Sequence, residues 1–340
     1  MVNDPPGGPT IANAIAAYLD MLRLARSDDT ARTYANGLRA LASVLSERWL
    51  PPDKTPAANL PEAAVGWLAK HLKHFSPATE RVYLDAAIGF YTYAAAENLA
   101  NVNLPRVRQL IKQRARRPGI RLPQFPTEEI EKLLQVILLQ EPGASDSGSA
   151  RLRAMRDRAF LLTLADTGLR VSEACRLRRG DLDLTEGRAI VIGKGDKEAI
   201  VRFSSRATRA ITAYLALRAM LDGQSGRPLT SLPLFARHDK GAGSKIKPIT
   251  TNTGRNIVRE RVAEFLGEAT EGQITPHSFR HYFVTSVLRG SGNLKLAQAL
   301  ARHKSIQVTQ RYAHLSDEEL DRGYHEIFEN DDRRRNIGGG

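Results

Sequence analysis

Hydrophobic residues recur every three or four positions through the first hundred residues, and this spacing predicts four helices. The first, over residues 11 to 26, carries five apolar side chains on one face: Ile11, Ile15, Tyr18, Leu19 and Leu22. The starts of the other three are marked by capping residues or by a proline in the first turn: Asp29 or Thr30, Leu60-Pro61, and Ser76-Pro77. Residues 1–105 are therefore predicted to form a small, all-helical domain.

From residue 127 the pattern changes, because helical stretches are now interrupted by two short β runs. Residues 188–192 and 199–203 are rich in Ile and Val and flank a glycine-rich turn, which predicts a β-hairpin. Helices are expected around it, over residues 127–137, 153–164, 207–221, 256–266 and 317–328, with another beginning at Thr275-Pro276. The predicted fold class is mainly α (α+β): a helical domain followed by a mostly helical domain with a small antiparallel sheet.

The charged residues are distributed unevenly along the chain. The 340 residues carry 50 Lys and Arg against 37 Asp and Glu, a net charge of +13, which favours a polyanionic partner such as nucleic acid. The first 105 residues, however, hold nine basic against ten acidic residues. Residues 106–126 are the opposite, with seven cations and no acid: Arg106, Arg108, Lys112, Arg114, Arg116, Arg117 and Arg121. We interpret this segment as an interdomain linker that contacts the phosphate backbone, the alternative being a solvated linker with incidental charge.

Several function classes are disfavoured by what the sequence lacks. It has no run of about 18 apolar residues that could span a membrane, and its first residues do not resemble a signal peptide. Its one cysteine, Cys175, excludes an intrachain disulfide, and its apolar helical surroundings are typical of a core residue. No motif with metal-ligand or cofactor-binding spacing is present, so no metal or cofactor is expected. A cytoplasmic, nucleoid-associated protein is the prediction.

The candidate chemistry is concentrated between residues 275 and 315. His277 and Arg280 lie three residues apart at a predicted helix start, an Arg-His pair ends at His303, and Tyr312 follows nine residues later. The N-terminus of a helix suits a phosphate because of its free N–H groups and partial positive charge. Cations and imidazoles near one tyrosine suggest phosphoryl transfer with the tyrosine as nucleophile.

This arrangement resembles the C-terminal signature of the tyrosine recombinases of the phage-integrase, Xer and Cre type. ADTGLRVSEACRLRRGDLDL (165–184) is similar to the family's first arginine box, and IGKGDKEAIVRF (192–203) to its lysine-bearing β-hairpin. The resemblance implies one catalytic set: Arg170, Lys194, His277, Arg280, His303 and Tyr312. Glu173, one turn beyond Arg170, is expected to support that arginine. His281 and His314 flank the site and are weaker candidates than these six residues.

The resemblance also implies an activity and an architecture. A tyrosine recombinase cleaves DNA through a covalent 3′-phosphotyrosyl intermediate and exchanges strands between two duplexes through a Holliday junction, within a tetramer. Residues 1–105 would be the core-binding (SAM-like) domain and residues 127–328 the catalytic domain, closing as a C-shaped clamp on DNA with an inverted-repeat core site. The helix at 317–328 would be exchanged between protomers, residues 329–340 would be a disordered tail, and an arm-binding domain is not expected.

Two other functions are consistent with parts of the same pattern. A type IB topoisomerase-like enzyme would share the covalent chemistry but relax DNA as a monomer. A DNA-binding regulator would have a silent active site, which six matching positions argue against. The target sequence, the crossover spacing, the base-reading residues and the need for a partner recombinase or accessory factor are not predicted. The sequence also does not separate chromosome-dimer resolution from phage integration or transposon mobility.

Overall fold

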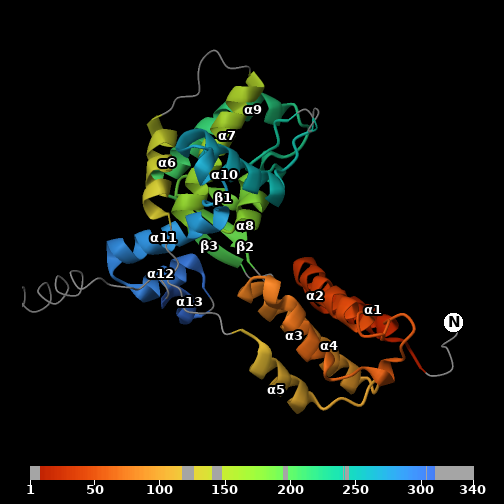
Figure 1. Cartoon of the computed structure of the whole chain (residues 1–340). Coiled ribbons are helices and arrows are strands. Elements are labelled where there is room, and N and C mark those ends of the chain that lie inside the picture. Colours follow the sequence, from red (N-terminus) through yellow and green to blue (C-terminus); the bar gives the residue numbers. More distant parts are fainter. Residues whose placement is uncertain are drawn as a thin grey trace, which may run out of the picture. The chain divides into compact units, whose positions relative to one another are not determined.

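The computed structural model describes residues 8–116, 126–139, 148–193, 198–239, 241, 245–303 and 305–310. The chain divides into two compact units, Met1–Arg121 and Leu122–Gly340 (Figure 1). Within the described residues, no helix combines the length and apolar character needed to cross a membrane.

The first unit is a bundle of five helices, coloured red to orange in Figure 1. They are α1 (Ile11–Ala25), α2 (Asp28–Ser46), α3 (Ala64–His71), α4 (Pro77–Ala96) and α5 (Leu104–Arg114), with short 3₁₀ turns at Ala57–Asn59 and Leu72–His74. The predicted cap at Ser76 is confirmed, since its hydroxyl accepts from the Thr79 N–H at 3.2 Å. The predicted cap of α2, Asp29 or Thr30, was two or three residues too late. Ser27 is the N-cap, and Asp28 and Asp29 lie in the first turn, where acidic residues suit the helix dipole.

Part of the segment that we interpreted as a linker is helical and belongs to the first unit. Helix α5 packs against α3 and α4 because Val107 and Ile111, four residues apart, are buried in the bundle core. Arg116, just beyond this helix, is bound to the bundle rather than solvated. Its Nε donates to Oε2 of the buried Glu80 at 2.5 Å, and its Nη2 donates to the Phe75 carbonyl at 2.5 Å.

The second unit is built around α7 (Gly148–Thr167), which contacts α6, α8, α9 and α11. Its other helices are α6 (Thr127–Leu139), α8 (Val171–Arg176), α9 (Ser205–Gly223), α10 (Thr251–Leu266), α11 (Pro276–Ser291), α12 (Leu294–Ala301) and α13 (Ile306–Gln310). Short 3₁₀ turns lie at Arg179–Asp181, Leu229–Ser231 and Glu268–Thr270. Almost every residue from 159 to 165 of α7 is fully buried. Because other elements surround this part of the helix, it has no polar face.

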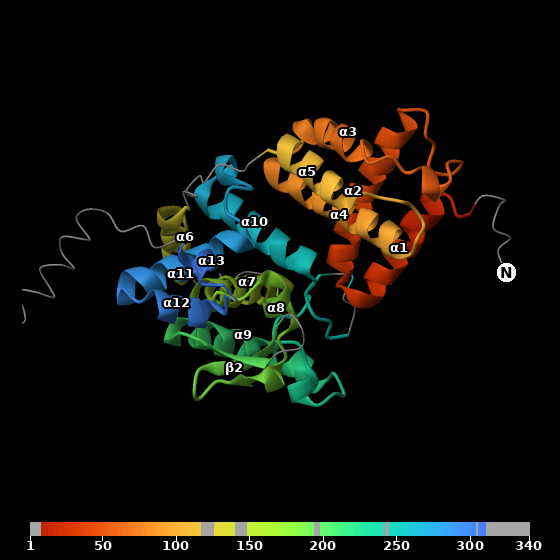
Figure 2. The same ribbon diagram turned by 90° about the horizontal axis from the view of Figure 1, so that it is seen from below.

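The predicted hairpin is confirmed. It forms strands β2 and β3 of a three-stranded antiparallel sheet of order β1-β2-β3. The strands are β1 (Leu182–Asp183), β2 (Arg188–Ile192) and β3 (Glu198–Arg202), with Ile190 paired to Ile200. Ala189, Val191 and Val201 face the core, whereas the isoleucines at 190, 192 and 200 are more than half exposed. In Figure 2 the sheet lies beside α9 at one side of this unit. The sequence pattern missed β1 because two residues are too short to show an alternation.

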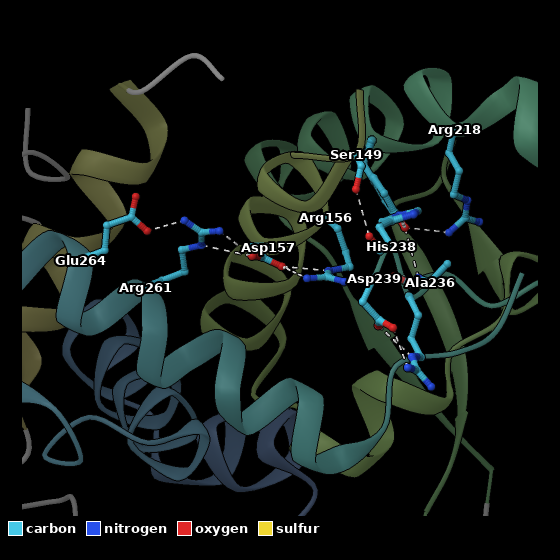
Figure 3. Close-up of polar contacts among 11 residues, drawn as sticks. Ser149, Arg156, Asp157, Arg218, Ala236, His238, Asp239, Arg261 and Glu264 are labelled. Carbon is cyan, nitrogen blue, oxygen red and sulfur yellow. Dashed lines mark hydrogen bonds and ion pairs between the residues drawn. The ribbon is translucent and has the colours of Figure 1, made fainter. Parts of the chain in front are cut away.

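The second unit also holds a set of buried and partly buried ion pairs, here called the support cluster: Arg156, Asp157, Arg261, Glu264, Arg179, Arg218 and Asp222. Asp157 joins two of these arginines, as Figure 3 shows. Its Oδ1 accepts from Arg156 at 2.6 Å, and its Oδ2 accepts from Arg261 at 3.0 Å. The fully buried Arg218 pairs with Asp222 at 2.9 Å and donates to the carbonyls of residues 233 and 234. Each of these cations has a carboxylate partner within 3 Å.

Candidate active site

The first part of the site is the turn between α7 and α8. Gly168 has φ +60°, and a β-carbon there would lie 2.4 Å from the Phe283 ring, so both the backbone angle and the space require glycine. Arg170 is the N-cap of α8 and is half exposed. Its Nη1 donates to Oε1 of Glu173 at 2.8 Å, and its backbone N–H donates to Oε2 at 2.9 Å. Glu173 is thus bonded to both the side chain and the backbone of Arg170.

The second part is the first turn of α11. Thr275 is its N-cap and Pro276 its first residue, as the sequence predicted. Arg280, one turn in, is almost fully buried, and its guanidinium donates to the backbone carbonyls of Gly168 and Ala301. His277 is more exposed, and its ring meets that of His281 edge-on, with 4.2 Å between the centroids. Two carbonyls from distant segments thus fix the Arg280 guanidinium beside these imidazoles.

The third part is the turn that ends α12. Arg302 is the C-cap, in left-handed backbone conformation with φ 57° and ψ 42°. Its Nη2 donates to Oε2 of Glu173 at 2.9 Å, so that one carboxylate binds two arginines. His303 follows immediately, and its Nδ1 lies 2.9 Å from the hydroxyl of the buried Thr309 in α13. Figure 1 shows α11, α12 and α13 packed together, and this packing brings residues 280, 302 and 303 to the same place.

The electrostatics confirm that these groups share one environment. Burial, followed by the Arg280 and Arg170 charges, lowers the pKa of His303 to about 4, and the same causes lower that of His277. Burial, then His277 and Arg280, lowers the pKa of His281 to about 3. The Glu173 carboxyl has a lowered pKa despite its burial, because hydrogen bonds from Arg170 and the charges of two arginines outweigh desolvation. At neutral pH the site therefore holds three neutral imidazoles, three guanidinium groups and one carboxylate.

A groove of about 860 Å³ opens beside the site. Ser172 and Glu173 of α8 line one wall, Ile190 and Ile192 of the sheet line another, and Thr250 lies at its edge. Thr250 is the N-cap of the 16-residue helix α10, and its hydroxyl accepts from the Thr253 N–H at 3.1 Å. The groove thus adjoins Glu173, which binds Arg170 and Arg302, and the N-terminal end of a long helix.

Several predicted site residues lie outside the described residues: Lys194, Tyr312, His314, Arg117 and Arg121. The same holds for the predicted helix at 317–328 and the tail at 329–340. Of the predicted backbone-binding cations, Arg106 pairs with Glu62 at 3.3 Å, and Arg114 lies against Gly66. Arg108 and Lys112 are exposed. Arg116 is bound to the buried Glu80, so its geometry is that of a structural anchor.

Sequence reasoning gave no role to Arg302, although it recognised the Arg-His pair. The bond to Glu173 spans 129 residues of sequence, and nothing in a single sequence indicates that a non-glycine residue adopts a left-handed conformation. The Ala301 carbonyl, which binds Arg280, was also missed because backbone acceptors have no sequence signature. Among the described residues there is no group of three or more His, Cys, Asp or Glu side chains that could hold a metal ion.

Comparison with known proteins assigns the family. The model of the phage integrase family matches residues 125–319, more than half of the chain. The chain belongs to the phage integrase family. The resemblance drawn from the motifs is thereby confirmed, and the chain is a tyrosine recombinase, an enzyme that transfers DNA strands.

Relatives match nearly the whole chain. Tyrosine recombinase XerC of Thermodesulfovibrio yellowstonii is 31% identical over 305 residues, which cover 88% of this chain and 91% of the relative. Tyrosine recombinase XerD of Mycobacterium tuberculosis is 29% identical over 320 residues, covering 89% and 93%. The solved structure of XerH site-specific recombinase bound to palindromic difH substrate is 22% identical, with a TM-score of 0.63 over 87% of this chain and 79% of that one. This last likeness confirms the predicted fold class.

Proposed function

We propose that this tyrosine recombinase is site-specific and that Tyr312 is its nucleophile, with Arg170, Lys194, His277, Arg280 and His303 completing the catalytic set. The observation that carries the proposal is the convergence of Arg170, Arg280, His277 and His303 from three separate segments, with a single carboxylate among them. An excess of fixed cations suits a group that becomes more negative during reaction, as a phosphodiester does when it is attacked.

In the proposed reaction the Tyr312 oxygen attacks the phosphorus and loses its proton, with His277 assisting the proton's removal. The bond from phosphorus to the 5′ oxygen breaks, and Lys194 protonates that oxygen. Arg170 and Arg280 stabilise the charge on the non-bridging oxygens, and His303 donates a hydrogen bond to one of them. The products are a 3′-phosphotyrosyl link and a free 5′-hydroxyl. Because the phosphodiester energy is conserved, the reverse attack rejoins DNA without ATP.

The DNA strand next to the reacting phosphate is proposed to follow the groove between the sheet and α10. Its wall supplies the hydroxyls of Ser172 and Thr250, and the first N–H groups of α10 suit a phosphate. The neighbouring Arg176 and Arg178 side chains are exposed. The finer expectations belong to the same proposal: an inverted-repeat core site, a C-shaped clamp, a tetramer with an exchanged C-terminal helix, a possible partner recombinase, and action at the nucleoid.

Covalent capture tests the proposal. Wild-type protein and Tyr312→Phe are incubated with fragmented, nicked genomic DNA of the source organism, the mixtures are denatured in detergent, and the attached DNA is sequenced. We expect adducts only with the wild-type protein, clustered at one inverted-repeat sequence. Scattered adducts that depend on Tyr312 would instead indicate a topoisomerase-like activity, and absence of adducts from both proteins would contradict the proposed chemistry.

A further inference from the structure

Arg302 combines three features that a surface arginine does not have. Its backbone is left-handed, and it is the one non-glycine residue with positive φ among the described residues of the second unit. Its side chain is only 15% exposed. Its Nε is buried and has no hydrogen-bond acceptor among the described residues. Glycine would relieve the backbone strain at this position, so the arginine side chain must offset its cost in another way.

The contacts of Arg302 indicate what the side chain does. Its Nη2 binds Glu173, whose two oxygens also hold the guanidinium and the backbone N–H of Arg170. Its backbone lies between Ala301, whose carbonyl accepts from Arg280, and His303. Arg302 is therefore linked to both arginines of the proposed catalytic set, Arg170 and Arg280, and is next to His303 in the chain.

We propose that Arg302 is a positioning residue that ties the turn after α12 to Glu173 and so fixes Arg170 and Arg280 relative to each other. This inference rests on the proposed function. Without the guanidinium, one Glu173 oxygen loses its second partner, and the Arg170 side chain is held by α8 alone. The turn that carries the Ala301 carbonyl would lose the side-chain bond that joins it to Glu173 of α8. Small displacements of fixed charges slow a reaction far more than they weaken substrate binding.

Three variants separate the side chain from the backbone. Arg302→Met and Arg302→Gly both remove the guanidinium, but only the glycine relieves the left-handed strain. Arg302→Lys keeps a cation without the planar fork. The readouts are the rate of detergent-stable adduct formation with fragmented, nicked genomic DNA, the affinity for the same DNA, and the melting temperature.

We expect adducts to form about 10-fold more slowly with both Arg302→Met and Arg302→Gly, with the lysine variant intermediate and DNA affinity unchanged. The melting temperature of Arg302→Gly should exceed that of Arg302→Met, although their rates are equal. A wild-type rate for Arg302→Gly, or rates that follow the melting temperatures, would overturn the inference, because the side chain would then matter only for folding.

A second measurement does not depend on the reaction. A double-mutant cycle of Arg302→Met and Glu173→Gln, read by urea unfolding of the protein alone, should show that the two changes are not additive. Additive changes would contradict the bond on which the inference depends. If wild-type protein gives no adducts, the proposed function fails, and this cycle still decides whether Arg302 and Glu173 act together.

Discussion

The active-site region and the support cluster use the same residue types to opposite effect. In the support cluster, Arg156, Arg179, Arg218 and Arg261 each have a carboxylate partner. In the site, Arg170 and Arg302 share the Glu173 carboxylate, whereas the Arg280 guanidinium donates to two backbone carbonyls. Both regions lie in the second unit, and both hold arginines that are largely or fully buried.

The difference shows how charge balance separates a structural cluster from a functional one. In the support cluster, four arginines share the carboxylates of Asp157, Asp222 and Glu264, so most of their positive charge is offset and little is left to offer a ligand. The two carbonyl bonds of Arg280 hold its guanidinium in place, and a neutral carbonyl does not neutralise its charge. The site is therefore suited to an anion, whereas the support cluster joins α7 to α10 and joins α9 to the 3₁₀ turn at Arg179–Asp181.

The largest expected effect comes from Arg280→Lys. A lysine ammonium cannot bond to both the Gly168 and Ala301 carbonyls while also presenting a planar fork to phosphate, so adduct formation should fall by about 10²-fold. The loss of one carbonyl bond should lower the free energy of unfolding by only about 1–2 kcal/mol. Adduct formation and urea unfolding, measured on the same preparation, test both parts.

Asp157→Asn is the matched change in the support cluster. It leaves the buried Arg156 and the partly buried Arg261 without their shared charge, so the free energy of unfolding should fall by about 3 kcal/mol. The adduct rate at low temperature, where the variant remains folded, should equal that of the wild-type protein. If Asp157→Asn slowed the reaction as much as Arg280→Lys, the distinction between the two regions would be wrong.

A smaller effect is expected from Gly168→Ala, which adds strain to the turn that binds Arg280. The left-handed backbone alone costs about 1–2 kcal/mol for a non-glycine residue, and the new β-carbon would also press on the Phe283 ring. Gly292→Ala is the control, because Gly292 has φ +61° and open space around it. Both variants should be less stable in urea, but only Gly168→Ala should also slow adduct formation. Equal reaction rates would mean that the Gly168 carbonyl does not position Arg280.

The sequence predicted the frame of the site better than the bonds that organise it. The caps at Ser76 and Thr275, the glycine turn before Arg170, and the hairpin all follow from local rules, and they were correct. Helices α12 and α13 were not predicted, and together they span only thirteen residues in short segments. The links from Arg280 to two carbonyls and from Arg302 to Glu173 were also missed. The bonds to Gly168 and Glu173 join residues more than a hundred positions apart, and the bond to Ala301 joins residues 21 positions apart; all of them depend on packing rather than on any local pattern.

The smallest effect concerns how the histidines of the two regions respond to an anion. His238, which lies 2.8 Å from the Tyr214 hydroxyl beside the support cluster, has a pKa of about 4 because of burial and the Arg156 and Arg218 charges. Its pKa is thus as low as that of His303. Unfolded histidine titrates near pH 6.5, so the unfolded chain binds more protons than the folded one between about pH 6.5 and 4. Stability contributed by both histidines is therefore fully present above pH 6.5 and is lost as the pH falls through this window, by about 1 kcal/mol for each partly exposed group.

DNA should distinguish the two histidines, which acid alone does not. A phosphate bound between Arg170 and Arg280 would offset the charges that lower the pKa of His303, and that pKa should rise by about one unit. The two arginines whose charges lower the His238 pKa most, Arg156 and Arg218, already have carboxylate partners, so that pKa should stay near its value in the free protein. The measurement is NMR titration of labelled histidines with and without duplex DNA. If the His238 and His303 signals shifted together, the anion would not be recognising the unbalanced charge of the site, and the contrast between the two regions would have no functional meaning.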